Sequence, residues 1–242
     1  MKKTTLHNIR RKIYAPRTFL PNDRSEISDG PFRSIRHTSP VSINWHITSE
    51  CSTDCKYCYL GRRKTKLLPF SRIQSLINEM SELDVFSIDL LGGDVLLYHN
   101  LVELLDMISE CNFLPINLST KSFLSKEKAL QLKKFSNIIW ELQFSIDTDD
   151  DQIAEYLVGI PDYTQRIFSS ISNAIEVGLR VAAKSVITPY NVFTIPRLYR
   201  KLKNIGVSEI RLAAYSRSGF HHSDDLFLND NCYKWLEEKV GE

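Results

Sequence analysis

The sequence predicts an α/β protein whose parallel sheet is built from six successive strand–helix units. Short apolar runs typical of strands alternate with longer segments in which apolar residues recur at helical spacing. The 242 residues suit one large domain, and a hydrophobic content of 43% is enough for a core. We therefore expect one α/β core from residue 41 onward.

The first three units occupy the first half of this core. Pro69 stands at the start of the first predicted helix, a position that proline favours. The second predicted strand ends in Gly92-Gly93. The predicted strands are residues 42–48, 85–91 and 116–119, and their helices are residues 70–82, 100–110 and 125–135.

The last three units follow the same pattern. The fourth strand leads into an acidic turn at residues 147–151, and Gly178 and Gly206 close two helices, as glycine commonly does. Leu236 and Val240 are expected on the inner face of the last helix. The predicted strands are residues 140–146, 181–187 and 209–215, and their helices are residues 163–177, 194–204 and 230–240.

Composition excludes several classes of protein. No run of eighteen apolar residues is present, so we expect no membrane span. The chain begins Met1-Lys2-Lys3 and continues without an apolar core, which is unlike a secretory signal. We therefore expect a cytoplasmic protein. Thiols stay reduced in the cytoplasm.

The N-terminal segment, residues 1–40, is basic, with nine Lys or Arg against three acidic residues. We expect it to be an extension separate from the core at residues 41–242. A solvated extension and a peptide-binding element both fit this charge. Nucleic acid is the less favoured partner, because only Tyr14, Phe19 and Phe32 in this segment could stack on bases.

Three cysteines stand within eight residues, as Cys51-x3-Cys55-x2-Cys58, directly after the first strand. Thiolates are the preferred ligands of iron–sulfur clusters, and a cubane takes four, so three leave one iron open. A structural zinc site would need a fourth ligand, such as His46 or a distant cysteine. A disulfide is disfavoured in a reducing compartment, and ordinary buried cysteines seldom cluster in this way.

This cysteine spacing, with aromatic Tyr57 before the last cysteine, resembles the signature of the radical S-adenosylmethionine (radical SAM) superfamily. The resemblance implies an open, partial (β/α)6 barrel over about residues 41–240, and a [4Fe-4S] cluster held by the three cysteines. It also implies S-adenosyl-L-methionine (SAM) on the open iron, cleaved by one electron to a 5′-deoxyadenosyl radical that takes hydrogen from a substrate. The backbone carbonyl of Tyr57 would face the adenine of SAM.

Two further elements resemble family motifs. Gly92-Gly93-Asp94 is similar to the Gly-Gly-Glu-Pro element that meets the methionine amino group, with Asp94 and Val95 as departures. Ser145 and Asp147, in Phe-Ser-Ile-Asp, resemble Ser-Leu-Asp-Gly. By this resemblance Ser145 faces the SAM carboxylate or ribose, whereas Asp147 either binds SAM or caps the turn.

The family arginine that precedes a glycine is absent at Val158-Gly159. Lys184 is expected to supply the missing charge, because an unpaired ammonium on an apolar strand is costly and a carboxylate partner resolves it. Asn191, in a Thr-x-x-Asn turn, either stabilises the turn or binds SAM.

Other candidate ligands are expected to be unrelated to the cluster. Cys111 and Cys232 are too few for a second cluster and are expected to be small buried residues. The stretch His221-His222-Ser223-Asp224-Asp225 is interpreted as an exposed loop.

The motifs most resemble radical SAM enzymes that modify peptides or proteins, a group often carrying a C-terminal cysteine-rich SPASM extension, which this sequence lacks. The resemblance implies a peptide or protein substrate, maturation of a peptide, and an electron donor such as flavodoxin or ferredoxin. Two different functions stay open. One is a radical SAM enzyme acting on RNA or a small metabolite, and the second is a cluster-bearing binding protein without turnover.

Overall fold

The structure is a computed structural model that describes residues 40–60, 68–83, 85–111, 115–216 and 223–239. The basic segment predicted at residues 1–40 lies outside the described residues except for Pro40. None of the helices within the described ranges is both long and apolar enough to cross a membrane.

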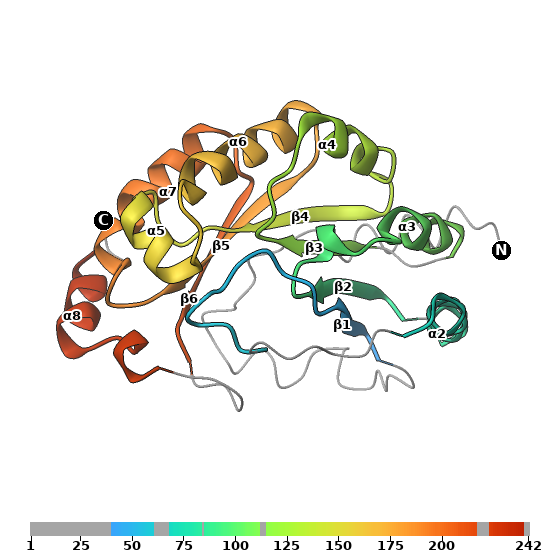
Figure 1. The fold of residues 1–242 in the computed structure, drawn as a ribbon, viewed down its shortest axis with the longest axis horizontal. Helices are drawn as coiled ribbons and strands as arrows, with labels where there is room; N and C mark the ends of the chain where they lie inside the picture. The colour runs from blue at the N-terminus through green and yellow to red at the C-terminus, as the bar shows by residue number, and fades with distance from the viewer. Residues whose placement is uncertain (1–39, 61–67, 84, 112–114, 217–222, 240–242) are drawn as a thin grey trace, which may run out of the picture. The chain divides into compact units, whose positions relative to one another are not determined.

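Six parallel strands form one sheet whose spatial order follows the chain, from β1 to β6. The outermost strands are not paired with each other, so the sheet stays open, as Figure 1 shows. The strands are β1 (Ser42–Thr48), β2 (Ser87–Gly92), β3 (Ile116–Thr120), β4 (Ile139–Ser145), β5 (Val181–Ile187) and β6 (Glu209–Ala214). This architecture confirms the predicted partial (β/α)6 barrel.

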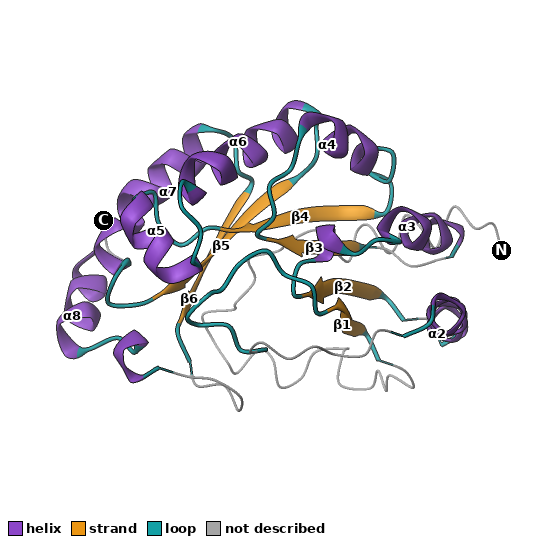
Figure 2. Cartoon of the chain, in the orientation of Figure 1, coloured by secondary structure: helices purple, strands orange, loops and turns teal. Residues whose placement is uncertain are grey.

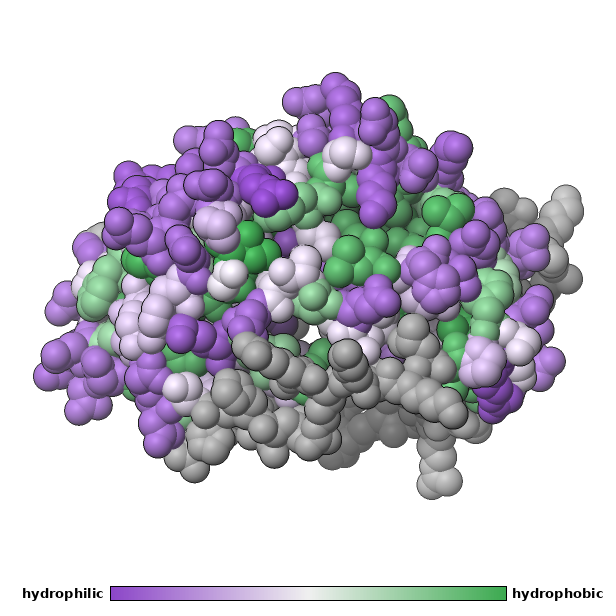
Figure 3. Space-filling view, in the orientation of Figure 1, coloured by the Kyte–Doolittle hydropathy of each residue, from purple (hydrophilic) through white to green (hydrophobic). Residues whose placement is uncertain are grey.

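The helices follow the strands around one side of the sheet (Figures 1 and 2). They are α2 (Phe70–Glu82), α3 (Leu101–Glu110), α4 (Lys126–Lys133), α5 (Asp151–Val158), α6 (Tyr163–Glu176), α7 (Ile195–Asn204) and α8 (Asp230–Lys239). Short 3-10 turns are η3 (Val95–Leu97), η4 (Val192–Thr194) and η5 (Asp224–Leu226). Hydrophilic residues dominate the visible surface over α6 and α7, at the upper left of Figure 3.

The two faces of the sheet differ in chemistry because side chains alternate along each strand. One face is apolar and buried in the main core, with Leu90, Leu118 and Phe144 fully buried. The opposite face, called the inner face below, is polar. The strand register places side by side on it Asn44, Asp89, Asn117, Ser119, Glu141, Gln143, Ser145, Lys184 and Arg211.

Helix α5 is the element that the sequence did not predict, because the acidic run before it was interpreted as a turn. In the structure, the last three aspartates of this run each accept hydrogen bonds from other residues. Asp149 receives two hydrogen bonds from Nε of Arg197, at 2.9 and 2.7 Å, and Asp151 accepts hydrogen bonds from Thr164. Asp150 is the N-cap of α5 and accepts from the backbone N–H groups of the first turn.

Replacing this N-cap, Asp150→Ala, is expected to lower the free energy of unfolding by about 1 kcal/mol. The Asp150 carboxylate accepts from Gln152 N at 3.0 Å and Ile153 N at 3.1 Å, and alanine offers neither bond. Denaturant unfolding measures the change. Asp150→Asn keeps an acceptor and should unfold close to wild type; an equal loss in both variants would contradict the capping role.

Candidate functional site

The three-cysteine loop, Cys51–Cys58, follows β1 at the C-terminal edge of the sheet. Cys51 is exposed, Cys55 and Cys58 are half-buried, and all three are free thiols rather than disulfides. The hydroxyl oxygen of Thr53 lies 3.2 Å from the sulfur of Cys51 and 3.3 Å from that of Cys55. The first two sulfurs therefore sit on the same side of the loop, around one hydroxyl group.

The donor set fits an iron–sulfur cluster better than a single metal ion. Within the described ranges, no three His, Cys, Asp or Glu side chains converge closely enough to hold one ion, as zinc would require. The thiolates of a cubane bind separate irons and need not converge on one point. The cysteine assignment stays a prediction, and the free thiols on one loop are compatible with it.

The glycines at the end of β2 hold the start of this loop. Gly93 N donates to Thr48 O at 2.8 Å, and Asp94 N donates to Glu50 O at 2.6 Å. A Cβ atom on Gly93 would lie 2.2 Å from Glu50 O, and one on Gly92 would lie 2.6 Å from Thr48 O. Glycine is needed here because two backbones touch, and in this structure the close neighbour is the protein's own chain.

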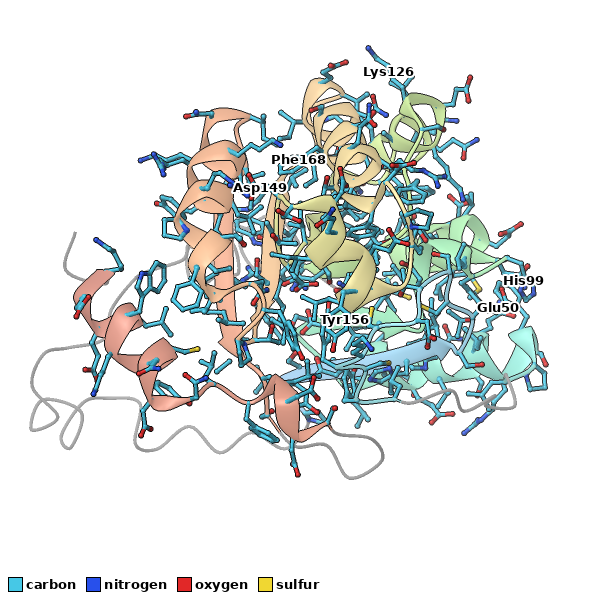
Figure 4. All side chains as sticks on the ribbon, turned by 60° about the vertical axis from the view of Figure 1, so that its left-hand side comes forward. Glu50, His99, Lys126, Asp149, Tyr156 and Phe168 are labelled. Atoms are coloured by element: carbon cyan, nitrogen blue, oxygen red, sulfur yellow. The ribbon has the colours of Figure 1, made fainter. Side chains whose placement is uncertain are left out.

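The end of α5 holds the middle of the loop. Asp54 N donates to Val158 O and Lys56 N donates to Leu157 O, both at 2.9 Å. These carbonyls belong to the last turn of α5, where they lack partners within the helix. The ammonium of Lys56 also lies 4.3 Å from the ring centre of Tyr156, which Figure 4 labels on the same helix.

A third attachment is a partly buried polar trio that joins the loop to the sheet. The Tyr57 hydroxyl donates to Oδ2 of Asp147, and the Lys121 ammonium donates to Tyr57 Oη at 2.6 Å and to Asp147 Oδ2 at 3.1 Å. Asp147 also accepts from Val186 N at 2.8 Å through its other oxygen. Lys121 matches no motif found in the sequence; its place directly after the third strand was the one available signal.

Burial and mutual attraction set the protonation of this trio. Burial alone would lower the pKa of Lys121, but attraction to Asp147 and Tyr57 holds that pKa well above its usual value. Burial, reinforced by the charge of Asp147, raises the pKa of Tyr57 well above its ordinary range. Burial also raises the pKa of Cys55, with Lys121 opposing the shift. Within the trio, Lys121 is thus a charged ammonium and Tyr57 a neutral phenol.

Two predicted SAM contacts have their polar atoms engaged within the protein. The Asp94 carboxylate is buried and accepts from Leu96 N, Thr120 Oγ1 and Lys121 N. The buried Asn191 amide accepts from Thr188 N and Oγ1 and donates to the carbonyls of Asp147 and Val186. Both side chains stabilise turns at strand ends, and their binding of SAM stays a prediction.

Ser145 and Lys184 are the predicted contacts whose side-chain polar atoms have no partner among the described residues. They lie side by side in the register of β4 and β5, on the inner face. The expectation that Lys184 is buried in an apolar strand was wrong, because its side chain is exposed. Its apolar neighbour Ala183 points to the opposite face, so the ammonium needs no carboxylate partner.

The remaining two cysteines are far from this loop in the sequence. Cys232, on α8, is buried as expected, whereas Cys111, at the end of α3, is only half-buried. His221 and His222 lie outside the described residues. Asp225, from the same predicted loop, accepts a hydrogen bond from the hydroxyl of Tyr190 at 2.7 Å.

Comparison with curated proteins finds relatives of modest identity. A probable GTP 3',8-cyclase of Methanothermobacter thermautotrophicus is 29% identical over 147 residues, which cover 60% of this chain and 47% of that protein. One from Saccharolobus islandicus is 24% identical over 188 residues, covering 74% of this chain and 60% of that protein. The chain thus spans about half to three fifths of the length of these two relatives.

Comparison with solved structures finds the same fold. SuiB of Streptococcus suis matches with a TM-score of 0.70 at 19% identity, covering 84% of this chain and 47% of SuiB. The enzyme anSMEcpe, with bound SAM and a peptide, matches with a TM-score of 0.69 at 14% identity, covering 84% of this chain and 59% of anSMEcpe.

The comparison with protein-family models matches one continuous stretch of the chain, which carries most of the sheet. The model of the radical SAM superfamily aligns with residues 45–202, which run from β1 through α7. This range includes the three cysteines, Gly92-Gly93 and the polar trio. The chain therefore belongs to the radical SAM superfamily, which implies a [4Fe-4S] cluster and SAM as its cofactors.

Proposed function

We propose that this chain is a radical SAM enzyme that removes a hydrogen atom from a peptide or protein substrate. Cys51, Cys55 and Cys58 would hold the cluster, and Ser145 and Lys184 would face SAM with their free polar atoms. When bound, the two cofactors supply a one-electron cleavage of SAM and an oxidant for carbon–hydrogen bonds. The electron would come from a donor such as flavodoxin or ferredoxin.

The observation that carries the peptide proposal is the charge balance of the inner face. Arg211 donates to Glu141 at 2.5 Å, to Glu209 at 2.8 Å and to Gln143 at 2.9 Å, so its charge is already neutralised. Among the described residues of this face, Lys184 is the cation without an ion pair. Nucleoside triphosphates carry several charges and need clustered cations, which the described residues of this face do not offer.

The same face offers mixed donors and acceptors, which suit a peptide. Asn117 donates to Asp89 at 2.6 Å, and Gln143 donates to Ser119 at 2.9 Å, so amide, hydroxyl and carboxylate groups stand together on this face. Peptide backbones present alternating N–H and C=O groups, which pair with such a surface. In the matched structure of SuiB bound to its precursor peptide SuiA, the shared fold is found with a peptide.

The curated relatives favour a second candidate, a reaction on GTP. Their name, probable GTP 3',8-cyclase, and the 29% identity of the first are its support. Under this second candidate the phosphates would require cations beyond those described on the inner face. The two candidates therefore differ in a property that can be measured directly.

An anaerobic assay distinguishes the candidates. The protein is reconstituted with iron and sulfide and given SAM and dithionite, with either GTP or synthetic peptides encoded by short reading frames beside its gene. We expect one peptide, made with deuterium on its carbon atoms, to pass deuterium to 5′-deoxyadenosine and to change in mass. GTP should be recovered unchanged.

Conversion of GTP would overturn the peptide proposal and establish the second candidate. A well-formed cluster with no 5′-deoxyadenosine under any condition would contradict both candidates. The chain would then be a cluster-bearing protein without turnover of its own.

A further inference from the structure

We propose that the outer edge of β6 holds the peptide substrate of the proposed function, on which this inference rests, as an added strand of the sheet. β6 is the last strand of the open sheet, and among the described strands it pairs with β5 alone (Figure 1). Its other edge is the surface on which a peptide would lie.

Every second residue of β6 turns its backbone N–H and C=O groups away from β5. Tyr215 N, directly after the strand, donates to Ile187 O at 3.0 Å, in continuation of the register between the two strands. Because the direction of these groups alternates along a strand, those of Ile210, Leu212 and Ala214 point outward. No other described segment forms a hydrogen bond with them. Within the described chain, the edge therefore presents an unpaired row of donors and acceptors.

The apolar face of the sheet is also left uncovered at β6. On β5 this face is buried, with Ala183 and Ser185 fully covered and Ile187 5% exposed. On β6, by contrast, Leu212 is 47% exposed, and Ala214 is exposed as well. A strand added beyond β6 would cover these two side chains, and the burial of apolar surface favours its binding.

The opposite edge of the sheet, at β1, is less suited to this role. Its side chains on the apolar face are Ile43, Trp45 and Ile47, which pack against the core and are half-buried or buried. A strand added there would remove less apolar surface from water than one added at β6.

An extended peptide is the partner whose chemistry matches the edge of β6. Outward groups recur at every second residue of a strand, about 6.6 Å apart, and an extended main chain carries N–H and C=O groups at the same spacing. Side chains of the added strand would alternate between the two faces of the sheet. Those beside Arg211 would lie on the polar inner face, and those beside Leu212 on the apolar face. We therefore expect a peptide in which polar and apolar residues alternate.

The position of this edge connects it to the predicted SAM contacts. Ser145, Lys184 and Arg211 share one register row across β4, β5 and β6. Neighbouring strands lie about 4.8 Å apart, so a strand beyond β6 would lie about 10 Å from β5. Its inward side chains would extend the face on which Ser145 and Lys184 lie.

Hydrogen exchange at single backbone amides, read by mass spectrometry with fragmentation, tests this edge in the reconstituted full chain. The probe is a synthetic peptide that alternates threonine and valine and carries a lysine at each end. In the free protein, the amides of Ile210, Leu212 and Ala214 should exchange fast, because they have no partner within the described chain. Millimolar probe should slow their exchange several-fold.

Two methylated peptides and two protein variants serve as matched pairs. N-methylation of all valines, or of all threonines, removes one alternate set of N–H groups, and only one set faces β6. One methylated peptide should therefore lose the protection and the other keep it. Leu212→Lys should weaken the protection several-fold because it places a charge in the apolar row. Leu130→Lys, at a leucine on α4 that is 52% exposed, should leave the protection unchanged.

Absence of protection by the probe, or an equal effect of the two methylated peptides, would overturn main-chain pairing at β6. Slow exchange at this edge in the free protein would overturn it as well. Slowing that grows with protein concentration would assign the edge to a second copy of the chain, and slowing that does not would assign it to another segment of the same chain. Protection by the probe in a protein that takes deuterium from no peptide would contradict the proposed function and keep the binding edge.

Deuterium transfer without protection at β6 would overturn the binding edge alone.

Discussion

The variant Cys51→Ala/Cys55→Ala/Cys58→Ala is expected to lose its iron while keeping its fold. Wild type should take up about four irons per chain with one cubane, and the variant almost none. The three thiols are exposed or half-buried and lie on a loop, so their loss should change the free energy of unfolding by only about 0.5 kcal/mol. Iron analysis, visible absorbance and 5′-deoxyadenosine formation measure the loss.

A matched control uses the two cysteines outside the loop. Cys111→Ala/Cys232→Ala removes the same chemical group twice and should keep iron and SAM cleavage. Because Cys232 is buried, a modest loss of stability is expected there without loss of the cluster. Iron retained by the triple variant, or lost by the control, would contradict the assignment of the cluster to the loop.

The fold could be predicted largely from the sequence because its signals are local. Apolar periodicity placed β1 and β5 at their observed bounds and located every described α-helix except α5, but none of the short 3-10 turns. That helix was missed because three consecutive acidic residues suggest a turn, and only the structure shows that Asp150 caps a helix. Local patterns predict an element well when residues typical of helix or strand ends mark its bounds.

The site was less predictable because its contacts join distant segments. Lys121 and Tyr57 are 64 positions apart, and nothing beside either residue in the sequence indicates the other. Lys184 shows a different kind of error: the apolar strand around it suggested that its side chain is buried. The alternation of side chains instead places its ammonium on the exposed inner face.

The geometry also changes the meaning of the paired glycines. The resemblance indicated that Gly92-Gly93-Asp94 meets the methionine amino group of SAM. The structure shows that the backbone close to the two glycines is Thr48–Glu50, directly before the cysteines. Loop position and β2 are therefore coupled by a contact that leaves no space for a side chain.

Gly93→Ala is accordingly expected to damage both the fold and the cluster site. Its new methyl group would stand 2.2 Å from Glu50 O, a backbone atom that cannot rotate away. Relief of the overlap requires β2 and the loop to separate, which breaks the bonds from Gly93 N and Asp94 N. We expect the free energy of unfolding to fall by about 1–3 kcal/mol or more. Iron uptake should fall several-fold, measured by denaturant unfolding and iron analysis.

Gly206→Ala is the control that separates a general glycine effect from this contact. Gly206 has φ of +92°, and among the described residues a Cβ there meets only Ile175, at 3.8 Å. Alanine at Gly206 should therefore cost about 1 kcal/mol of backbone strain and leave iron uptake intact, since the residue follows α7 rather than the cysteine loop. If Gly93→Ala lost stability but bound iron like Gly206→Ala, the backbone contact would support the sheet without positioning the cysteines. A parallel loss of stability and iron would show that the end of β2 holds the cysteine loop in place.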